Sequence, residues 1–448
     1  MKRQPNIILV MTDDQGWGDT GYNGHPELKT PHLDSLAADG VRFDRFYSAA
    51  PVCSPTRGSS ITGRHPYRYG IFFANVGHLP PEEITLAEAL KTQGYATGHF
   101  GKWHLGTLTK DIEDGRRGGR ENEHYSPPWG NGFDECFSTE ITVPTWDPMR
   151  DMKISGRYWT GPGEWATENL DGDDSRVIMD RAVPFVRKQA RDKTPFLAVI
   201  WFHAPHEPVR GGPEYRKQYA HLSEDKQHYY ACITAMDEQV GRLRRELEEL
   251  GITENTMLWF CSDNGPAGEG GGCAQHPGKR QQGSPGPFRG RKGSLYEGGV
   301  RVPGLLCYPG GVEGGRVIDT PCCTSDYFPT VMDLLGFRLK GAPEPLDGIS
   351  LMPILRGERE QRNHAIGFES QEQVSLVEDH YKLYSPNRGE TYELYDLLAD
   401  KEETGDIAGQ YPGRVGRMAE ELENWRESCR VSREGGDYRM SPADQEDG

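Results

Sequence analysis

Four short apolar runs along the chain each end in a cluster of polar residues. The runs are Asn6 to Met11, Tyr95 to Phe100, Phe196 to Phe202 and Thr256 to Cys261. Runs of this length, bounded by polar and glycine residues, indicate buried β-strands. In open α/β sheets the ligand crevice lies beyond the carboxyl ends of the strands. The polar clusters that follow the four runs are therefore predicted to meet at one site.

Segments with apolar residues at helical spacing alternate with these runs. Helices are predicted from Thr30 to Gly40, from Thr85 to Gly94, over Asp174 to Ala190, over Ser223 to Leu250 and over Ser325 to Leu335. Thr85 and Glu88 form a capping-box pattern, and Pro184 predicts a kink in its helix. Alternation of this kind predicts the α/β class, with a large and mostly parallel sheet sandwiched by helices.

The pattern changes near Gly341, where a proline-rich connection begins. Four short strands in antiparallel order are predicted beyond it, followed by a terminal helix over Arg414 to Arg430. We therefore predict two domains, an α/β catalytic domain over residues 1–340 and a smaller C-terminal α+β domain with an antiparallel sheet over residues 341–448.

Two long stretches, Thr107 to Trp165 and Gly265 to Gly293, have no regular pattern. Loops of this length in a compact domain are usually functional or mobile. Five of the nine tryptophans lie in or beside the first stretch: Trp103, Trp129, Trp146, Trp159 and Trp165. Two interpretations stay open, since flat aromatic rings suit the apolar faces of sugars but also fasten a long loop to the protein body.

Composition narrows the class of protein. The 448 residues carry a formal net charge of −17, which disfavours a polyanion-binding surface, and no basic segment typical of nucleic-acid binding occurs. An anionic substrate would need a local basic pocket, for which Arg57, Lys102, Arg289, Arg291 and Lys292 are the candidates. The nine cysteines are an odd number without regular spacing, so a disulfide framework is not expected.

No apolar stretch approaches the roughly 20 residues needed to span a bilayer, so a soluble protein without a membrane partner is expected. Met1-Lys2-Arg3 resembles the charged start of a signal peptide, but the following apolar run is short and ends in acidic residues. Two locations stay open: the cytoplasm, or the periplasm or exterior with a leader that this sequence lacks.

The first and fourth runs end in hard oxygen ligands. Asp13 and Asp14 follow the first run, and Asp263 and Asn264 follow the fourth. Three carboxylates and an amide suit Ca²⁺ or Mg²⁺ and suit zinc poorly. Adjacent acids alone are usually solvated turn residues, but the repeat of the pattern after two buried strands favours a divalent cation.

Nucleophilic and proton-transfer candidates lie at the other strand ends and at Cys53. Pro55 predicts that Cys53 lies at a helix N-terminus, where negative charge is favoured, so a thiolate nucleophile and an inert buried thiol are both open. Lys102 and His104 have alternate spacing, which would point both side chains to one side of an extended segment. His203 and His206 follow the third run as candidate proton donors.

Four motifs together carry a family resemblance. They are the string from Cys53-Ser54-Pro55-Thr56-Arg57-Gly58 to Arg64, the segment Gly101-Lys102-Trp103-His104-Leu105-Gly106, the segment Pro205-His206-Glu207-Pro208, and Gly290 to Pro303 around Lys292. The chain resembles the type I, formylglycine-dependent sulfatases of the alkaline phosphatase superfamily over nearly its whole length. The resemblance is weakest over residues 107–170, where sulfatases differ by substrate.

This resemblance implies a mechanism and a set of partners. A formylglycine-generating enzyme would oxidise Cys53, and Ca²⁺, with Mg²⁺ as the less favoured ion, would bind Asp13, Asp14, Asp263, Asn264 and the modified Cys53. One hydroxyl of the formylglycine hydrate would attack sulfur, and the second would later expel sulfate. The implied roles are orientation of the hydrate for Arg57, release for His104, sulfate binding for Lys102 and Lys292, and protonation of the leaving alcohol for His206.

The substrate implied by the family is a sulfated carbohydrate, whose sulfate ester is hydrolysed on the end unit of the chain, or an aryl sulfate. Two other functions remain open. One is a phosphonate or phosphodiester hydrolase with the same formylglycine and metal. The other is a non-catalytic glycan-binding protein in which Cys53 is never modified.

Overall fold

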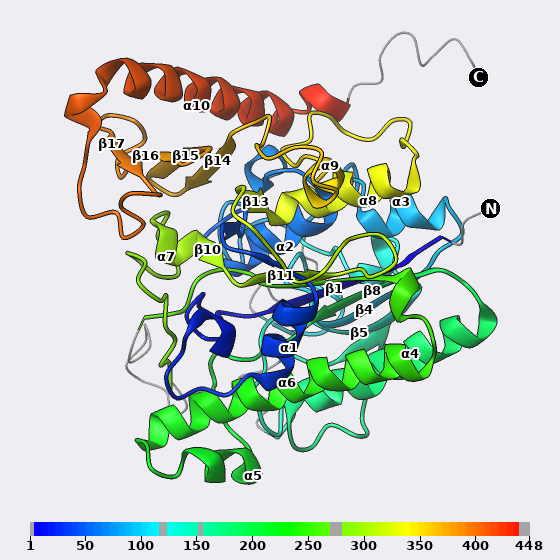
Figure 1. Cartoon of the computed structure of the whole chain (residues 1–448). Coiled ribbons are helices and arrows are strands. Elements are labelled where there is room, and N and C mark those ends of the chain that lie inside the picture. The colour runs from blue at the N-terminus through cyan, green and yellow to red at the C-terminus, as the bar shows by residue number, and fades with distance from the viewer. Residues whose placement is uncertain (1–3, 116–122, 151–155, 269–279, 439–448) are drawn as a thin grey trace, which may run out of the picture.

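The computed structural model describes residues 4–115, 123–150, 156–268 and 280–438 (Figure 1). A ten-stranded sheet forms its centre, in the order β12-β2-β11-β9-β1-β8-β4-β5-β6-β7. The four predicted runs are neighbouring strands of this sheet: β1 (Asn6–Thr12), β4 (Ala96–Lys102), β8 (Phe196–Trp201) and β9 (Thr256–Ser262). They pair in parallel, so their carboxyl ends lie at one edge. The predicted α/β class is confirmed.

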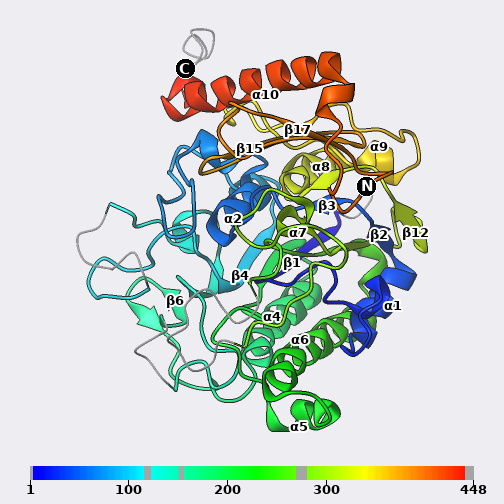
Figure 2. The same cartoon turned by 90° about the vertical axis from the view of Figure 1, so that its left-hand side faces the viewer.

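Helices cover both faces of this sheet (Figures 1 and 2). One face packs against α1 (Pro31–Asp39), α4 (Asp174–Asp192) and α6 (Glu224–Glu249). The other packs against α2 (Cys53–Thr62), α3 (Leu86–Lys91) and α8 (Tyr327–Leu335). Alternate residues of β1 enter the two cores, because successive strand side chains point to opposite faces.

The predicted helices exist, with ends shifted by a few residues. The capping box of Thr85 and Glu88 is present at the start of α3. Thr30 precedes α1, but its hydroxyl accepts a hydrogen bond from Gly21 N and donates to Asp34 instead of capping the helix. The smaller helices are α5 (Pro213–Arg216), α7 (Glu297–Val300) and α9 (Met352–Leu355).

The edges of the large sheet are mixed. The strand β11 (Gly304–Cys307) runs antiparallel to β9 and to β2 (Val41–Phe43), and β12 (Arg316–Ile318) closes that edge parallel to β2. A separate three-stranded sheet contains β3 (Phe46–Tyr47), β10 (Arg301–Val302) and β13 (Cys322–Cys323).

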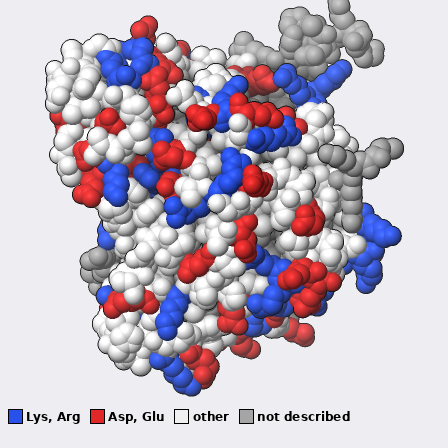
Figure 3. Space-filling model, viewed as in Figure 1, with Lys and Arg blue, Asp and Glu red and all other residues white. Residues whose placement is uncertain are grey.

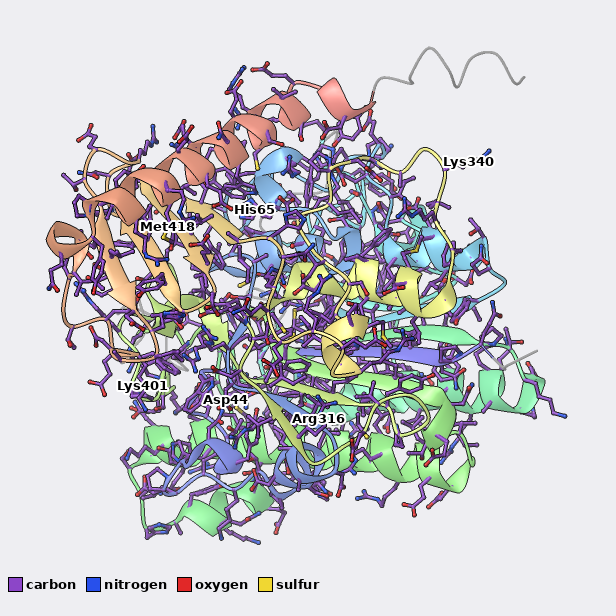
Figure 4. All side chains as sticks on the ribbon, turned by 45° about the horizontal axis from the view of Figure 1, so that its top comes forward. Asp44, His65, Arg316, Lys340, Lys401 and Met418 are labelled. Carbon is purple, nitrogen blue, oxygen red and sulfur yellow. The ribbon has the colours of Figure 1, made fainter. Side chains whose placement is uncertain are left out.

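A four-stranded antiparallel sheet follows near the C-terminus, as predicted. Its strands are β14 (Ile366–Ser370), β15 (Gln373–Glu378), β16 (Tyr381–Ser385) and β17 (Glu393–Asp396). The helix α10 (Pro412–Arg433) lies across it, and buried Met418 packs between the two (Figure 4). This core of Met418, Leu422, Val374, Leu376, Leu383 and Leu394 is separate from those of the large sheet.

The stretch from Thr107 to Trp165 is more regular than its sequence indicates. It contributes β5 (Glu135–Thr139), which pairs in parallel with β4, and then β6 (Trp159–Gly161) and β7 (Glu164–Trp165). Trp103 and Trp159 are buried in the core, which supports the loop-fastening interpretation for these two rings. Trp165 is 42% exposed.

The structure also shows the distribution of surface charge, the state of the cysteines and the character of the helices. The face shown in Figure 3 carries interspersed acidic and basic side chains. The eight cysteines in the described part of the chain are all free and buried. Within the same part, no helix combines the length and apolar character needed to cross a bilayer. Met1-Lys2-Arg3 lies outside the described residues.

Candidate active site

The four predicted oxygen ligands meet at the carboxyl ends of β1 and β9. Thr12 and Ser262 are register partners, so the residues that follow them emerge side by side. Asp14 N donates to Asp263 Oδ1 over 3.1 Å, and Asn264 Nδ2 donates to Asp14 Oδ1 over 2.7 Å. All four side chains are buried. Asp14 adopts φ 64°, a left-handed conformation that turns the chain sharply after β1.

Cys53 is the first residue of α2, as Pro55 predicts. Its Sγ lies 3.4 Å from Lys292 Nζ. Ligand atoms of Asp13, Asp14, Cys53 and His206 all lie within 4.8 Å of one another. Burial raises the pKa of the Cys53 thiol to about 12, although Lys102 and Lys292 oppose this effect. The unmodified residue is therefore a thiol at neutral pH, which disfavours the thiolate interpretation.

Three cations neutralise the three carboxylates. Arg57 Nη2 lies 2.7 Å from Asp263 Oδ2, Lys102 Nζ lies 2.6 Å from Asp13 Oδ2, and Lys292 Nζ lies 2.6 Å from Asp14 Oδ1. The Arg57 guanidinium also lies over the Trp201 ring. Arg57 and Lys102 are fully enclosed by protein, whereas 21% of the Lys292 side chain is exposed.

The carboxylates have opposite pKa shifts. Burial tends to raise the pKa of Asp13, but Lys102, His206, Arg57 and Lys292 together hold it well below its usual range. Burial, reinforced by Asp13, raises the pKa of Asp263 to about 7. One of the carboxylates thus holds a proton more readily than its neighbour, because both cannot be charged at low cost without a further cation.

The donor set fits a hard divalent cation. Asp13 Oδ1 and Asn264 Oδ1 are buried and have no hydrogen-bond partner among the described residues. Buried polar atoms are normally paired, so two orphaned oxygens beside Asp14 and Asp263 indicate a position for a ligand. Carboxylate and amide oxygens are the donors that Ca²⁺ and Mg²⁺ use.

His206 and His203 have different surroundings. His206 Nδ1 donates to Glu207 O over 2.6 Å, and its Nε2 lies 3.6 Å from Asp14 Oδ2. Burial lowers the pKa of His206 to about 4 despite the nearby Asp13 and Asp14. His203 instead lies 2.8 Å from both Asp174 Oδ2 and Thr139 Oγ1 in a closed buried network. This geometry favours His206 over His203 as the residue that faces a substrate.

The segment that carries Lys102 and His104 is not extended. Lys102 ends β4, and His104 has φ 60°, so the backbone reverses before its side chain leaves. His104 Nε2 lies 2.7 Å from Asn75 Oδ1, and Asn75 N donates to Ser54 Oγ, next to Cys53. Asn75 thus links His104 to the start of α2. No motif in the sequence around Asn75 indicates this role.

Only three of the five basic residues predicted to form the pocket contact the carboxylates. Arg57, Lys102 and Lys292 contact the carboxylates, but Arg289 turns to the C-terminal sheet, where its Nη1 donates to Tyr395 Oη and Glu403 O. Arg291 Nη1 donates to the carbonyls of Ala267 and Gly283. The prediction was wrong for Arg289, because closeness in sequence to Lys292 does not fix the direction of a side chain.

Comparison with known proteins places these motifs in context. The model of the sulfatase family matches residues 5–337, and that of the N-sulphoglucosamine sulphohydrolase C-terminal region matches residues 288–428. A steryl-sulfatase of Mus musculus is 33% identical over 82% of this chain and 67% of its own length. An N-acetylgalactosamine-6-sulfatase of Canis lupus familiaris is 33% identical over 79% of this chain and 66% of its own length. The chain thus spans about two thirds of these relatives.

Among solved structures, Ps i-CgsB superposes with a TM-score of 0.82 at 25% identity. The match covers 94% of this chain and 93% of that one.

Proposed function

The chain belongs to the sulfatase family of sulfuric ester hydrolases, and on that premise we propose that it hydrolyses a sulfate ester of a carbohydrate. The proposed reaction uses a formylglycine formed from Cys53 and a bound Ca²⁺. The observation that carries the proposal is the position of Cys53 at the start of α2, where its Sγ lies within 4.8 Å of ligand atoms of Asp13, Asp14 and His206.

Asp13, Asp14, Asp263 and Asn264 would hold the cation, with the modified Cys53 beside it. The cation would supply Lewis-acid polarisation of the sulfate group, and the formylglycine would supply a hydrated aldehyde as nucleophile. With a divalent cation bound, the three carboxylates no longer balance Arg57, Lys102 and Lys292. The site would then carry surplus positive charge and attract a sulfate ester anion.

The remaining side chains divide the work of binding and proton transfer. Lys102 and Lys292 would bind sulfate oxygens, and Arg57 would fix Asp263 beside position 53 through its 2.7 Å ion pair. His206 would face the departing alcohol oxygen with Nε2, and because Nδ1 already donates to Glu207 O, it would carry a second proton at Nε2 for that oxygen only as the imidazolium. His104, oriented by Asn75, would act in the release of sulfate.

The carbohydrate part of the proposal rests on two supports. The N-acetylgalactosamine-6-sulfatase similarity includes most of this chain. Trp165 is exposed on the edge strand β7, separated from β1 by four strands, so its flat ring suits the apolar face of a distant unit of a sulfated glycan. We propose that the sulfate ester is hydrolysed on the end unit of a sulfated oligosaccharide, with small aryl sulfates as surrogate substrates.

We also propose that the chain divides after residue 340 into the α/β domain and the C-terminal domain. The separate core beneath α10 supports this division. The match to the C-terminal family model begins earlier, at residue 288, so that model includes the region around Lys292 together with the C-terminal sheet.

The deciding experiment is mass spectrometry of the Cys53 peptide, from protein made with a formylglycine-generating enzyme, joined to turnover of paired esters. We expect the aldehyde mass, hydrolysis of sulfated sugars that a chelator abolishes and Ca²⁺ restores, and a strong preference for the sulfate over the phosphate ester of one alcohol. A phosphate preference would favour the phosphonate or phosphodiester hydrolase. Glycan binding without turnover by the modified protein would favour the binding protein.

A further inference from the structure

The C-terminal sheet contacts the segment that carries Lys292. We propose that Gln373 and Lys382 of this sheet are positioning residues that set the place of the Lys292 ammonium in the active site. The inference rests on the proposed function, in which Lys292 binds the sulfate group. It assigns a role in the reaction to two residues far from the reacting atoms.

Gln373, the first residue of β15, binds the backbone on both sides of Ser294. Its Nε2 donates to Gly293 O over 2.8 Å, and its Oε1 accepts from Leu295 N over 2.9 Å. An amide that both donates to and accepts from one short segment fixes its distance and its orientation. Gly293 is bonded directly to Lys292, so a shift of this segment moves the lysine.

Lys382 holds the next part of the segment. Its Nζ lies 2.9 Å from Glu297 Oε1 and 2.9 Å from Glu403 Oε1, and all three side chains are fully enclosed. Glu297 N donates to Glu403 Oε2 over 2.6 Å. A buried cation shared by two carboxylates tolerates little displacement, because each charge is stable only while it is paired. Glu297 begins α7, so this ion triad fixes the end of the segment to the C-terminal sheet.

The opposite side of the same segment contacts the active site. Lys292 N donates to Pro266 O over 3.0 Å, and Gly293 N donates to Pro51 O over 2.9 Å, two residues before Cys53. Gly265 N, directly after Asn264, donates to Gly299 O over 2.9 Å. The segment therefore lies between the C-terminal sheet and the turns that carry Cys53 and Asn264.

The Lys292 side chain is partly exposed, so the position of its backbone depends on contacts from the C-terminal sheet. Lys102 projects from the end of a central strand and is enclosed, whereas Lys292 lies in a stretch without regular structure before α7. A lysine side chain has many rotamers, so its reach to a sulfate oxygen depends on where its backbone is held. Gln373 and Lys382 supply that constraint.

The test is a double-mutant cycle between Gln373→Leu and Lys292→Ala in the formylglycine-containing, Ca²⁺-loaded protein. We expect Gln373→Leu to lower kcat/KM and to weaken inhibition by inorganic sulfate, each by about 10-fold. In the Lys292→Ala background the same substitution should change either quantity less than about 2-fold, because the side chain it positions is gone. Equal effects in both backgrounds would overturn the proposal.

The matched control is Ser375→Ala in the same strand. Ser375 is buried, and its Oγ donates to Leu383 O within the C-terminal sheet, so its loss perturbs that sheet without a direct contact to Lys292. We expect unchanged sulfate inhibition in this variant. A loss equal to that of Gln373→Leu would show a general effect of the sheet and overturn the assignment.

Hydrogen exchange tests the positioning without any turnover. Leu295 N loses its acceptor in Gln373→Leu, so amide exchange over residues 293–297 should accelerate while the flanking strands β9 and β11 keep their protection. Unchanged exchange would overturn the inference even if the protein is an active sulfatase. Faster exchange in a protein without sulfatase activity would instead retain the positioning and reject the proposed function.

Discussion

Two buried clusters of charge in this protein are built differently. The candidate active site contains Asp13, Asp14, Asp263, Arg57, Lys102 and Lys292. The second, here called the domain-contact cluster, contains His65, Arg68, Asp347, Trp425, Ser428 and Ser432, and lies where α10 and the residue 347 region meet residues 65–68, across the proposed domain boundary (Figure 4, where His65 is labelled). Both bury ionised groups, yet only the first has the composition of a reactive site.

The difference lies in how completely the carboxylates are paired, since His65 Nε2 of the domain-contact cluster also has no hydrogen-bond partner among the described residues. Each nitrogen of the Arg68 guanidinium donates to Asp347, Ser428 or Ser432, and Asp347 also accepts from Trp425 Nε1. Burial tends to raise the pKa of Asp347, but Arg68 and His65 together lower it to about 2. In the active site, Asp263 has a pKa raised to about 7, and Asp13 Oδ1 has no hydrogen-bond partner among the described residues, with Arg57 Nη2 3.7 Å away. Incomplete pairing, more than burial itself, indicates where a ligand is expected.

The sharpest test of this comparison is removal of the nucleophile. We expect Cys53→Ala and Cys53→Ser to lower kcat/KM at least ~10⁴-fold, because alanine has no group at Cβ that can become the aldehyde and serine lacks the thiol that a cysteine-oxidising maturation enzyme requires. The midpoint of thermal unfolding should change little in Cys53→Ser. The control is Cys136→Ala, a buried cysteine of β5 outside the cluster, which should keep its turnover. Full activity in either Cys53 variant would refute the formylglycine mechanism.

The domain-contact cluster should respond in the opposite way. Arg68→Met leaves the Asp347 carboxylate buried and unpaired, so we expect the free energy of unfolding to fall by about 3–5 kcal/mol. The kcat/KM of the molecules that remain folded should stay within about 2-fold, since Arg68 touches none of the site residues. Urea unfolding and active-site titration measure the two quantities.

The control for Arg68 is Arg388→Ala, which removes an exposed ion pair with Glu372. Pairs of this kind contribute little to stability, so the unfolding curve should hardly move. A large loss of turnover in folded Arg68→Met, without a loss of stability, would remove the contrast between the two clusters.

The sequence predicts the carboxylates of the active site but not all of the strands and side chains around them. Asp13 and Asp263 follow apolar strands, and parallel register brings the ends of such strands together, so their meeting is predictable. The strand β5 was missed because Glu135-Cys136-Phe137-Ser138-Thr139 is a strand through its pairing with β4 more than through its own pattern. Arg289 was misplaced and Asn75 was missed because side-chain direction depends on tertiary contacts far away in sequence.

The smallest expected effect concerns the pH dependence of the domain-contact cluster. Burial lowers the pKa of His65 to about 4, opposed by Asp347 and aided by Arg68, while the unfolded value is 6.5. The folded state therefore binds fewer protons between these values, and the stabilisation present above pH 6.5 is lost as the pH falls toward 4. The loss is about 3 kcal/mol for a shift of this size.

The variant His65→Asn tests that dependence, because its amide oxygen can replace His65 Nδ1 as the acceptor of the Tyr67 amide but does not titrate. We expect its free energy of unfolding to fall less steeply than that of the natural sequence between pH 6.5 and 4. Asp347 stays ionised in the folded state across this range, with a pKa of about 2, so the difference between the two curves reports His65. Parallel curves would mean that His65 is protonated in the folded state and that the domain-contact cluster is less closed than its pairing indicates.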